Sequence, residues 1–491
     1  MNSLITWLDQ RTGLPTQIAT FLTEDVPGGA SYWYVFGSAT LFTMILQYVT
    51  GIFLTFYYAP SSATAWESTK YIYDHVPLGW FVMSLHYWGA TAMIALLFMH
   101  LLQGLIWGAY KAPREIMWVV GVLLLVLTLV LGLTGYLLPW DMNAYFASQV
   151  AINIASSVPI VGEPTQQFLS GGAGMGTLTI NRFFGLHVWL IPALLVLLVA
   201  GHLVIFRHNG SAGPPVDSDL KKLPQGRFWP NQLFMDGFAS FLVFIVIVAL
   251  SIFAVPPLDQ KADPTQTYIA YPAWYFLALY GMLRLAGAAP ESIIPTANLF
   301  ATVLIPGGLV TLLVLLPWID RNPARALRRR PWILGLTTLS VVVAVGLSVY
   351  SQLAIVKEQA EAAQTKPAVA SAVPGNAGEA VPASARKGAK VFAANCASCH
   401  GAAGQGTPNV FPPLAGNPDV TGDPKKIIHV VLYGLNNTPM TVMGGNYKGI
   451  MPSWESNLST ADIADVVTYI RSSWGNKATP VNAADVAKVT K

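Results

Sequence analysis

Charged residues are scarce in this chain. Asp, Glu, Lys and Arg make up 11% of its 491 residues, whereas apolar residues make up 53%. A soluble domain usually carries about 25% charged residues, so a water-covered surface over most of the chain is excluded. We therefore expect a membrane protein. The net charge of +4 is small, and we expect no nucleic-acid partner.

Cysteine is scarcer still. The two cysteines lie in one pentapeptide, Cys396-Ala397-Ser398-Cys399-His400. The pattern C-x-x-C-H is the attachment signature of a covalent c-type haem. We expect Cys396 and Cys399 to hold the porphyrin and His400 to be an axial iron ligand. The alternative is a disulfide or a thioredoxin-like pair, which the adjacent His400 and the glycines after it disfavour.

A second axial ligand is needed, and methionine is the usual soft partner. Met440, Met443 and Met451 are the candidates. We predict Met451, because Met451-Pro452 precedes an amphipathic helix expected at residues 460–474. That order, with the segment 411–416 (FPPLAG), resembles class I cytochrome c. The other two methionines are then packing residues of a loop.

Seven apolar stretches are long enough to cross a bilayer, which takes about 20 helical residues. Lys and Arg are concentrated in the even-numbered connections between them, and such residues mark the cytoplasmic side. We expect a multi-pass protein of the bacterial inner membrane without a cleaved signal peptide. Its N-terminus is then cytoplasmic and its C-terminus lies on the periplasmic, outer side. The expected spans are residues 36–57, 80–107, 117–138, 178–206, 235–255, 299–318 and 332–353.

Composition also suggests domain boundaries. The predicted fold class is all-α, a transmembrane bundle of about seven helices joined to a small α-helical cytochrome c domain. A stretch rich in Ala, Pro and Gly before that domain predicts a flexible linker. The expected divisions are residues 1–215 (four spans), 216–355 (three spans), 356–385 (linker), 386–476 (cytochrome c domain) and 477–491 (tail).

Four of the eight histidines lie inside apolar helices. His86 and His100 share the second span, and His187 and His202 share the fourth. Fourteen residues of helix rise about 21 Å in nearly four turns, so the two rings of one helix face the same side. Two antiparallel helices could hold two b haems, with His86 and His187 at the outer level and His100 and His202 at the inner level. A lone buried histidine is more often structural, but two matched pairs favour ligands.

Glycines repeat the same interval. Gly37 and Gly51 are fourteen residues apart on the first span, as are Gly121 and Gly135 on the third. Small residues also serve helix–helix packing in membranes. The shared interval favours clearance for two flat macrocycles.

Residues 33–353 resemble cytochrome b of the quinol:cytochrome c oxidoreductases. The resemblance rests on segments 47–51 (QYVTG), 135–140 (GYLLPW) and 181–184 (NRFF) and on the four histidines. It is closer to the chloroplast and cyanobacterial branch, because of the fifteen-residue second histidine interval and the seven spans. In that branch a cysteine tethers an extra haem. Val35 stands in its place, which excludes a covalent extra haem.

The resemblance implies a bifurcated reaction coupled to proton translocation. Quinol is oxidised at the outer face, and one electron passes through the two b haems to an inner quinone site. The other passes through a separate Rieske iron–sulfur protein to the fused haem c, and on to a soluble cytochrome c or a terminal oxidase. A Rieske cluster has no cysteines left in this chain. A homodimer within a larger complex is expected.

The quinol-site motif of the family, Pro-Glu-Trp-Tyr, reads Pro272-Ala273-Trp274-Tyr275 here. The resemblance implies an outer pocket lined by Pro272, Trp274, Tyr275 and Tyr145, with Tyr275 as the hydrogen-bond partner of quinol. Ala273 cannot accept a proton, so Glu291, Asp141 or water remain as acceptors. The missing carboxylate hints at a low-potential quinol such as menaquinol.

Charged residues near the span ends complete the implied sites. Asp236 matches the family's quinone-contacting aspartate, and Arg207 or His208 could support the charge of a reduced quinone. Arg114 and Arg182 are expected to pair with haem propionates; all could instead be surface charges. Because Ala273 departs from the motif, two rival functions stay open. These are a di-haem membrane anchor of a quinone-linked dehydrogenase and a simple transmembrane electron conduit.

Overall fold

The computed structural model describes two compact units. The first comprises Met1–Gly171, Met175–Gln260 and Tyr271–Ala354, and the second contains Lys261–Ala270 and Ile355–Lys491. The described residues are 2–171, 175–217, 220–264, 268–290, 293–364, 383–396, 400–401, 403–406, 411–436, 440–443, 445–447, 450–451, 453–455 and 458–489.

Among the described residues, seven helical segments are long and apolar enough to cross a membrane. Each overlaps one of the expected spans, and their ends differ from the expected ones by up to eight residues. The predicted all-α, seven-span fold is therefore confirmed. Four spans are compound. The fourth combines α9 (Thr177–Gly185), the π-helical turn η2 (Leu186–Leu190) and α10 (Ile191–Asn209). The fifth combines η4 (Phe228–Gln232) and α11 (Leu233–Phe253), and the sixth combines α13 (Ile294–Leu299), η6 (Phe300–Leu304) and α14 (Ile305–Ile319). The first combines η1 (Tyr32–Tyr34) and α3 (Val35–Thr55). The other three are α5 (Gly79–Trp107), α6 (Glu115–Tyr136) and α15 (Pro331–Gln364).

Shorter elements precede the first span and connect the spans to one another. Strand β1 (Asp25–Pro27) pairs antiparallel with β2 (Gln225–Arg227) and joins the N-terminal segment to the connection after the fourth span. The short helices are α1 (Asn2–Thr12), α2 (Leu14–Leu22), α4 (Ala65–Asp74), α7 (Met142–Ser156), α8 (Gly162–Ser170), η3 (Leu220–Lys222), η5 (Trp274–Phe276), α12 (Leu277–Gly287) and η7 (Leu327–Arg329).

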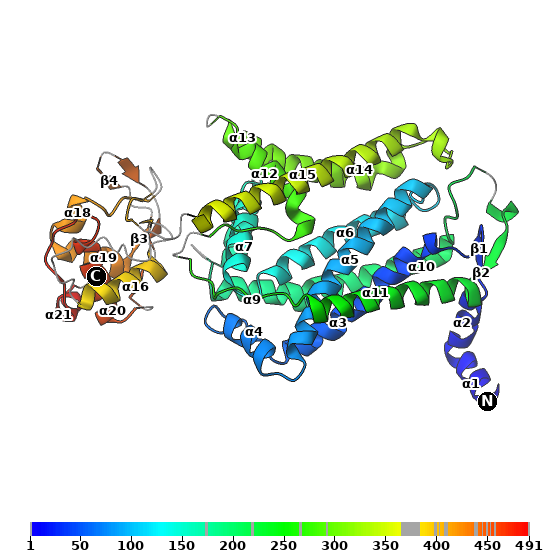
Figure 1. Cartoon of the computed structure of the whole chain (residues 1–491), viewed down its shortest axis with the longest axis horizontal. Coiled ribbons are helices and arrows are strands. Elements are labelled where there is room, and N and C mark those ends of the chain that lie inside the picture. Colours follow the sequence, from blue (N-terminus) through cyan, green and yellow to red (C-terminus); the bar gives the residue numbers. More distant parts are fainter. Residues whose placement is uncertain are drawn as a thin grey trace. The chain divides into compact units, whose positions relative to one another are not determined.

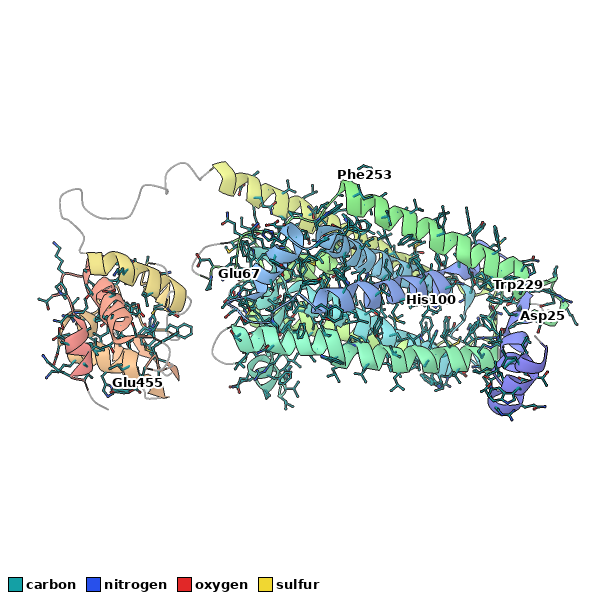
Figure 2. The ribbon with its side chains drawn as sticks, turned by 90° about the horizontal axis from the view of Figure 1, so that it is seen from below. Asp25, Glu67, His100, Trp229, Phe253 and Glu455 are labelled. Carbon is teal, nitrogen blue, oxygen red and sulfur yellow. The ribbon has the colours of Figure 1, made fainter. Side chains whose placement is uncertain are left out.

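Within the first unit α3 packs on α5, α6 packs on α10, and α11 packs on both α3 and α5 (Figure 1). Indole and phenol groups join neighbouring spans through backbone carbonyls. Tyr48 on α3 donates to the Pro192 carbonyl of α10 at 2.6 Å, and Trp118 on α6 donates to the Leu313 carbonyl of α14 at 2.6 Å. Such bonds satisfy polar groups where lipid offers no partner. Figure 2 shows Asp25 and Trp229 at one end of this bundle, Glu67 at the opposite end and His100 between them.

The second unit is a small helical domain. Its helix α16 (Ala383–Asn395) crosses α20 (Thr460–Ser472) at Gly388, where an added Cβ would lie 1.9 Å from the Asp465 carbonyl oxygen. Phe392 and Val467 belong to its buried core. The remaining elements are α18 (Pro418–Thr421), α19 (Pro424–Tyr433), α21 (Ala483–Ala487), and the short strands β3 (Leu435–Asn436), β4 (Met440–Val442), β5 (Gly445–Tyr447) and β6 (Ile450–Met451), paired β3–β6 and β4–β5.

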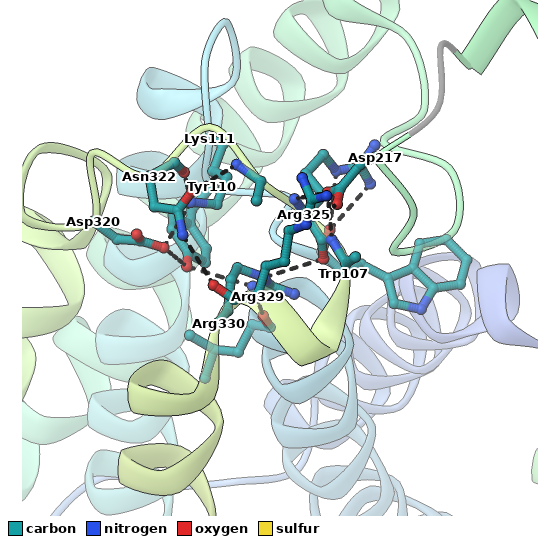
Figure 3. A network of polar contacts seen from close by, with 12 residues as sticks. Trp107, Tyr110, Lys111, Asp217, Asp320, Asn322, Arg325, Arg329 and Arg330 are labelled. Atoms are coloured by element: carbon teal, nitrogen blue, oxygen red, sulfur yellow. Dashed lines mark hydrogen bonds and ion pairs between the residues drawn. The ribbon is translucent and has the colours of Figure 1, made fainter.

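A polar network joins the C-terminal end of α5 to residues 320–330, which connect α14 to α15 (Figure 3). Arg330 donates to the Leu105 carbonyl at 2.9 Å, and Arg325 donates to the Trp107 carbonyl at 3.0 Å. The last carbonyls of a helix have no partner inside the helix, so these two guanidinium groups cap α5. Beside them Lys111 and Asp320 form a buried ion pair at 2.7 Å.

We expect the Lys111–Asp320 pair to be needed for stability. Asp320→Asn leaves the Lys111 ammonium buried without its counter-charge, which should lower the free energy of unfolding by about 3–5 kcal/mol. The measurement is the thermal unfolding of the detergent-purified protein. The control is Asp74→Asn, which breaks the exposed Lys70–Asp74 pair and should cost less than about 1 kcal/mol. Equal shifts in the two variants would contradict the prediction.

Candidate functional site

The two outer histidines face each other across the bundle. The ring centres of His86 on α5 and His187 in η2 lie 6.3 Å apart, and their planes are inclined by 75°. The Nδ1 atom of His86 lies 2.8 Å from the Thr50 hydroxyl, and that of His187 lies 3.1 Å from the Leu131 carbonyl. Because both Nδ1 atoms have partners, the two Nε2 atoms are the ring nitrogens available to bind a metal.

The two inner histidines differ in the hydrogen bonds that their Nδ1 atoms make. His100 Nδ1 lies 3.2 Å from Gln103 Oε1, and the Gln103 amide donates to the Trp33 carbonyl at 2.6 Å. The Nδ1 atom of His202 is buried beside the backbone of Met117, without a hydrogen bond of good geometry among the described residues. The structure thus fixes the ring of His100 more firmly than that of His202.

The turn η2 accounts for the unequal histidine intervals. A π-helical turn takes up one more residue than an α-helical turn. His187 lies within this turn, whose last bond runs from the Ile191 N–H to the Leu186 carbonyl. The fifteen residues from His187 to His202 therefore match the fourteen from His86 to His100.

Each of the four predicted glycines faces one of these imidazoles. An added Cβ at Gly51 would lie 3.3 Å from the His86 ring, and one at Gly135 would lie 2.5 Å from the His187 ring. At the inner level the distances are 3.3 Å between Gly37 and His100 and 3.5 Å between Gly121 and His202. The two glycine intervals thus follow the two histidine levels.

The spacing of the outer pair fits a haem iron held between two imidazoles. A metal–imidazole bond is about 2 Å long and the ring centre lies about 1 Å farther, so two imidazoles on one metal have centres roughly 6 Å apart. The outer pair meets that spacing. Among the described residues, no group of three or more His, Cys, Asp or Glu side chains could hold a bare metal ion. Two-histidine sets suit a macrocycle that supplies the remaining ligands.

In the second unit, a hydrogen bond at Nδ1 also orients the ring of His400. His400 is buried, and its Nδ1 lies 2.9 Å from the Pro412 carbonyl, which leaves Nε2 for a metal. Burial lowers the pKa of His400, and the Pro412 carbonyl partly opposes this shift, so the ring is neutral at pH 7. Cys396 follows the end of α16, and the His400 N–H donates to its carbonyl at 3.0 Å. Cys399 lies outside the described residues.

The predicted methionine ligand lies next to the core of the same unit. Met451 is in β6, partly buried against the core that contains Phe392. Met443 is 62% exposed, and the side chain of Met440 lies outside the described part of the structure. Met451 stays the prediction.

Comparison with known families accords with this geometry. Residues 21–210 match the family described as cytochrome b/b6/petB, and residues 261–369 match cytochrome b(C-terminal)/b6/petD. Residues 385–474 match the cytochrome c family. A cytochrome b of Allochromatium vinosum is 33% identical over 69% of this chain and 86% of its own length. The chain belongs to the cytochrome b family. It carries a cytochrome c domain at its C-terminal end, so the predicted fusion is confirmed.

Other relatives are subunits of electron-transfer complexes. A cytochrome bc complex cytochrome b subunit of Chlorobaculum thiosulfatiphilum is 33% identical over 72% of this chain and 82% of its own length. A menaquinol:cytochrome c reductase cytochrome b subunit of Geobacillus thermodenitrificans is 39% identical over 44% of this chain and 99% of its own length. A solved structure titled hyperthermophilic respiratory Complex III has a TM-score of 0.62 and 28% identity. It covers 71% of this chain and 91% of its own chain.

Tyr275, predicted to bind quinol, packs against α6. Its hydroxyl lies where a side chain at Gly132 would be, 2.8 Å from the added Cβ. Burial raises the pKa of Tyr275, so the hydroxyl is protonated and can donate. Trp274 contacts Tyr275 edge to face and is 44% exposed. Pro272 lies two residues before η5, which contains both aromatic residues.

Sequence reasoning missed Asn143, which ties this segment to α6. Its Oδ1 accepts from the Tyr271 N–H at 3.0 Å, and its amide donates to the Tyr136 hydroxyl. The Tyr136 hydroxyl in turn donates to the Tyr271 carbonyl at 3.0 Å. Tyr145, the remaining predicted residue of this pocket, is buried in α7 against Trp140. No sequence motif signalled the role of Asn143.

Asp141, one of the predicted proton acceptors, also forms structural hydrogen bonds. Its Oδ1 accepts from the Ala144 N–H at 2.8 Å and caps α7, and its Oδ2 accepts from the Asp259 N–H at 3.3 Å. Burial raises the pKa of Asp141, and the Ala144 and Asp259 N–H groups oppose that shift. Glu291, the other candidate, lies outside the described residues.

The predicted arginines have partners on the protein itself. Arg114 donates to the Asn209 and Ser211 carbonyls at 3.2 and 3.0 Å, and Arg182 donates to the Gln167 carbonyl at 3.1 Å. Binding to a propionate would have to use their other N–H groups. Arg207 forms an ion pair with Glu24 and lies over the ring of Phe21.

Asp236 lies at the N-terminal end of α11. It is 9% exposed and accepts a hydrogen bond from the Gln232 amide at 2.9 Å. Together with Ser38 and Phe241 it lines a cavity of about 420 Å³. The structure thus provides an apolar cavity with a carboxylate at the level predicted for the inner quinone.

The distances at the glycines predict that alanine will reduce haem binding at some of these positions more than at others. Gly135→Ala should lose about one of the two b haems, because its Cβ would lie 2.5 Å from the His187 ring. Gly121→Ala, with ordinary contact at 3.5 Å, is the matched control and should keep both. The measurement is the ratio of b haem to protein by pyridine haemochrome absorbance. Equal losses in the two variants would contradict clearance by glycine.

Proposed function

We propose that this chain is the cytochrome b and c subunit of a quinol:cytochrome c oxidoreductase. In this proposal quinol is oxidised at the outer face and quinone is reduced at the inner face, with protons moved across the membrane. The observation that carries the proposal is the 6.3 Å approach of His86 and His187. Its counterpart is the His100 and His202 level on the same two spans, about 21 Å away along the helix axis.

Two histidine pairs at two depths suit electron transfer across a bilayer. When bound, the two b haems supply one-electron carriers, and the haem of the second unit supplies a third. His86 and His187 would hold the outer haem, and His100 and His202 the inner one. The partners of the Nδ1 atoms of His86, His187 and His100 fix which nitrogen is free to ligate.

The outer quinol site would be formed by Pro272, Trp274, Tyr275 and Tyr145. A protonated Tyr275 hydroxyl can hydrogen-bond a quinol oxygen, and Trp274 contributes an aromatic surface. Asn143 holds the backbone of the segment through Tyr271. The Geobacillus and Bacillus subtilis relatives are named menaquinol:cytochrome c reductase subunits. We infer menaquinol as the quinol of this chain too.

The electron that leaves on the outer side needs partners that this chain does not encode. Its two cysteines are both assigned to haem c, so a separate Rieske iron–sulfur protein is inferred. The stretch between the end of α15 at Gln364 and the start of α16 at Ala383 tethers the haem c domain and keeps it at a high local concentration near that donor. A soluble cytochrome c or a terminal oxidase would be the next acceptor. We expect the complex to be a homodimer in the bacterial inner membrane, with the N-terminus cytoplasmic and the haem c domain on the periplasmic side.

Haem counts test the ligand assignment. The purified chain should contain two extractable b haems and one c haem that stays with the protein on a denaturing gel. His86→Leu should remove one b-type absorbance and leave the c haem, because only the outer site loses a ligand. Redox titration of the absorbance spectrum gives the count. An unchanged spectrum in single variants of all four histidines would refute the assignment.

Loss of the Tyr275 hydroxyl should slow quinol oxidation. Tyr275→Phe removes one neutral hydrogen bond, worth about 0.5–1.5 kcal/mol, so we expect a rate up to about tenfold lower with haem content unchanged. Tyr73→Phe is the control, because the Tyr73 hydroxyl only donates to the Pro256 carbonyl. The assay is reduction of cytochrome c by menaquinol, and equal rates in Tyr275→Phe and wild type would exclude Tyr275 from the site.

Co-purification separates the proposal from a di-haem dehydrogenase anchor, the rival that Ala273 keeps open. The complex isolated from native membranes should show a Rieske electron-paramagnetic signal, and outer-site quinol inhibitors should block turnover. A complex without that signal, or one insensitive to these inhibitors, would favour the anchor or a simple electron conduit.

A further inference from the structure

The cavity at Asp236 has the character of a site for a quinone head group. It lies where α3 and α11 pack together, and it is lined largely by apolar side chains, among them Phe42, Leu233 and Phe244. Asp236 is the one charged side chain among the described residues that line it. Phe241, also in the lining, is 56% exposed on the outside of the bundle. The cavity is therefore accessible from the lipid, where a quinone is dissolved.

A second buried side chain fixes the carboxylate. Gln232 is 3% exposed and lies one helical turn before Asp236. Its Nε2 donates to Asp236 Oδ1 at 2.9 Å. A buried hydrogen bond to a charged acceptor is stronger than one between neutral groups.

The backbone of Ser31 decides which way the Gln232 amide points. The Ser31 N–H donates to Gln232 Oε1 at 2.8 Å, and Gln232 Nε2 also donates to the Ser31 carbonyl at 3.2 Å. An amide oxygen and nitrogen are usually hard to tell apart, but a peptide N–H can only donate. Oε1 must therefore face Ser31, and a donor must face Asp236.

We propose that Gln232 is a positioning residue of the inner quinone site, acting through Asp236. The Gln232 amide occupies Oδ1, which leaves Oδ2 to accept the hydroxyl of a quinol or to exchange a proton with a quinone oxygen. The Ser38 hydroxyl also interacts with this carboxyl group. This inference rests on the proposed function, because Asp236 belongs to the inner site of that function. Gln232 itself does not line the cavity, so its effect on the reaction must pass through the carboxylate.

Few ionisable groups surround this pair. The elements packed against α11 are α3, α5, η1 and η4, and none of them contains Lys, Arg, Asp or Glu. The ionisable side chains of those elements are Tyr32, Tyr34, Tyr48, His86, Tyr87 and His100. η4, which contains Gln232, also packs against α2, β1 and β2, and the charged side chains of those elements are Asp25 in β1 and Arg227 in β2.

A double-mutant cycle on the intact complex tests the inference. With the outer site blocked by inhibitor, electron exchange between added menaquinone and the b haems is followed by stopped-flow absorbance. The maximal rate and the half-saturating quinone concentration are both measured. Gln232→Met should lower the maximal rate about tenfold, because the carboxylate loses a fixed donor. Asp236→Asn should lower the rate at least as much.

The decisive comparison is the double variant. If Gln232 acts through Asp236, adding Gln232→Met to Asp236→Asn should lower the rate less than twofold further. Gln225→Met is the matched control, because the Gln225 amide also binds backbone carbonyls, of Leu220 and Leu223, but has no contact with Asp236. It should exchange electrons at the wild-type rate. Haem content reports folding in every variant.

The outcomes separate the inference from the function on which it rests. A tenfold loss from Gln232→Met in both backgrounds overturns the positioning role. A wild-type rate in Gln232→Met with a slow Asp236→Asn also overturns it but leaves the proposed function standing. A wild-type rate in Asp236→Asn overturns both the inference and the inner site. If Gln232→Met fails to bind haem, Gln232→Glu keeps the acceptor for the Ser31 N–H and places a second carboxylate against Asp236. That variant should also be slow, and a wild-type rate in it overturns the inference.

Discussion

The first unit of this protein depends on placing imidazole rings between apolar helices. A buried histidine side chain in a bilayer is costly unless its polar atoms have partners. Three of the four rings have a partner for Nδ1, supplied by the Thr50 hydroxyl, the Leu131 carbonyl and the Gln103 amide. The same contacts orient the rings, so the groups that satisfy each histidine also point its other nitrogen into the bundle. Glycines opposite the rings keep that space open.

Buried polar groups also need hydrogen-bond partners elsewhere in the bundle. Helix ends and side-chain hydroxyls cannot rely on water, so they find partners on neighbouring segments. Arg325 and Arg330 cap α5, Asn143 joins Tyr271 to Tyr136, and Gln232 joins Ser31 to Asp236. Each of these links connects segments far apart in the sequence. Together they hold the second half of cytochrome b against the first and support both quinone sites of the proposed function.

Features that arise from local periodicity could be read from the sequence in advance. The seven spans, the facing of His86 and His100 on one helix, and the C-x-x-C-H haem c signature each depend on spacing alone. The glycine interval belongs to the same class. Asn143, Gln232 and the ion pair of Arg207 with Glu24 could not be found in this way. A single polar residue has no period, and its partner is chosen by packing.

The sequence by itself therefore determined the class of protein, the number of spans, the haem ligands it makes available and the membership of the cytochrome b family. Hydropathy and helical spacing depend on residues within a few turns of one another, so both can be recognised in consecutive residues. Only the tertiary structure decided which glycine faces which imidazole and how η2 brings a fifteen-residue interval into line with a fourteen-residue one. It also decided which amide holds Asp236. The physical reason is that buried polar groups must pair, and the pairing partner is whichever segment the packed helices bring within about 3 Å.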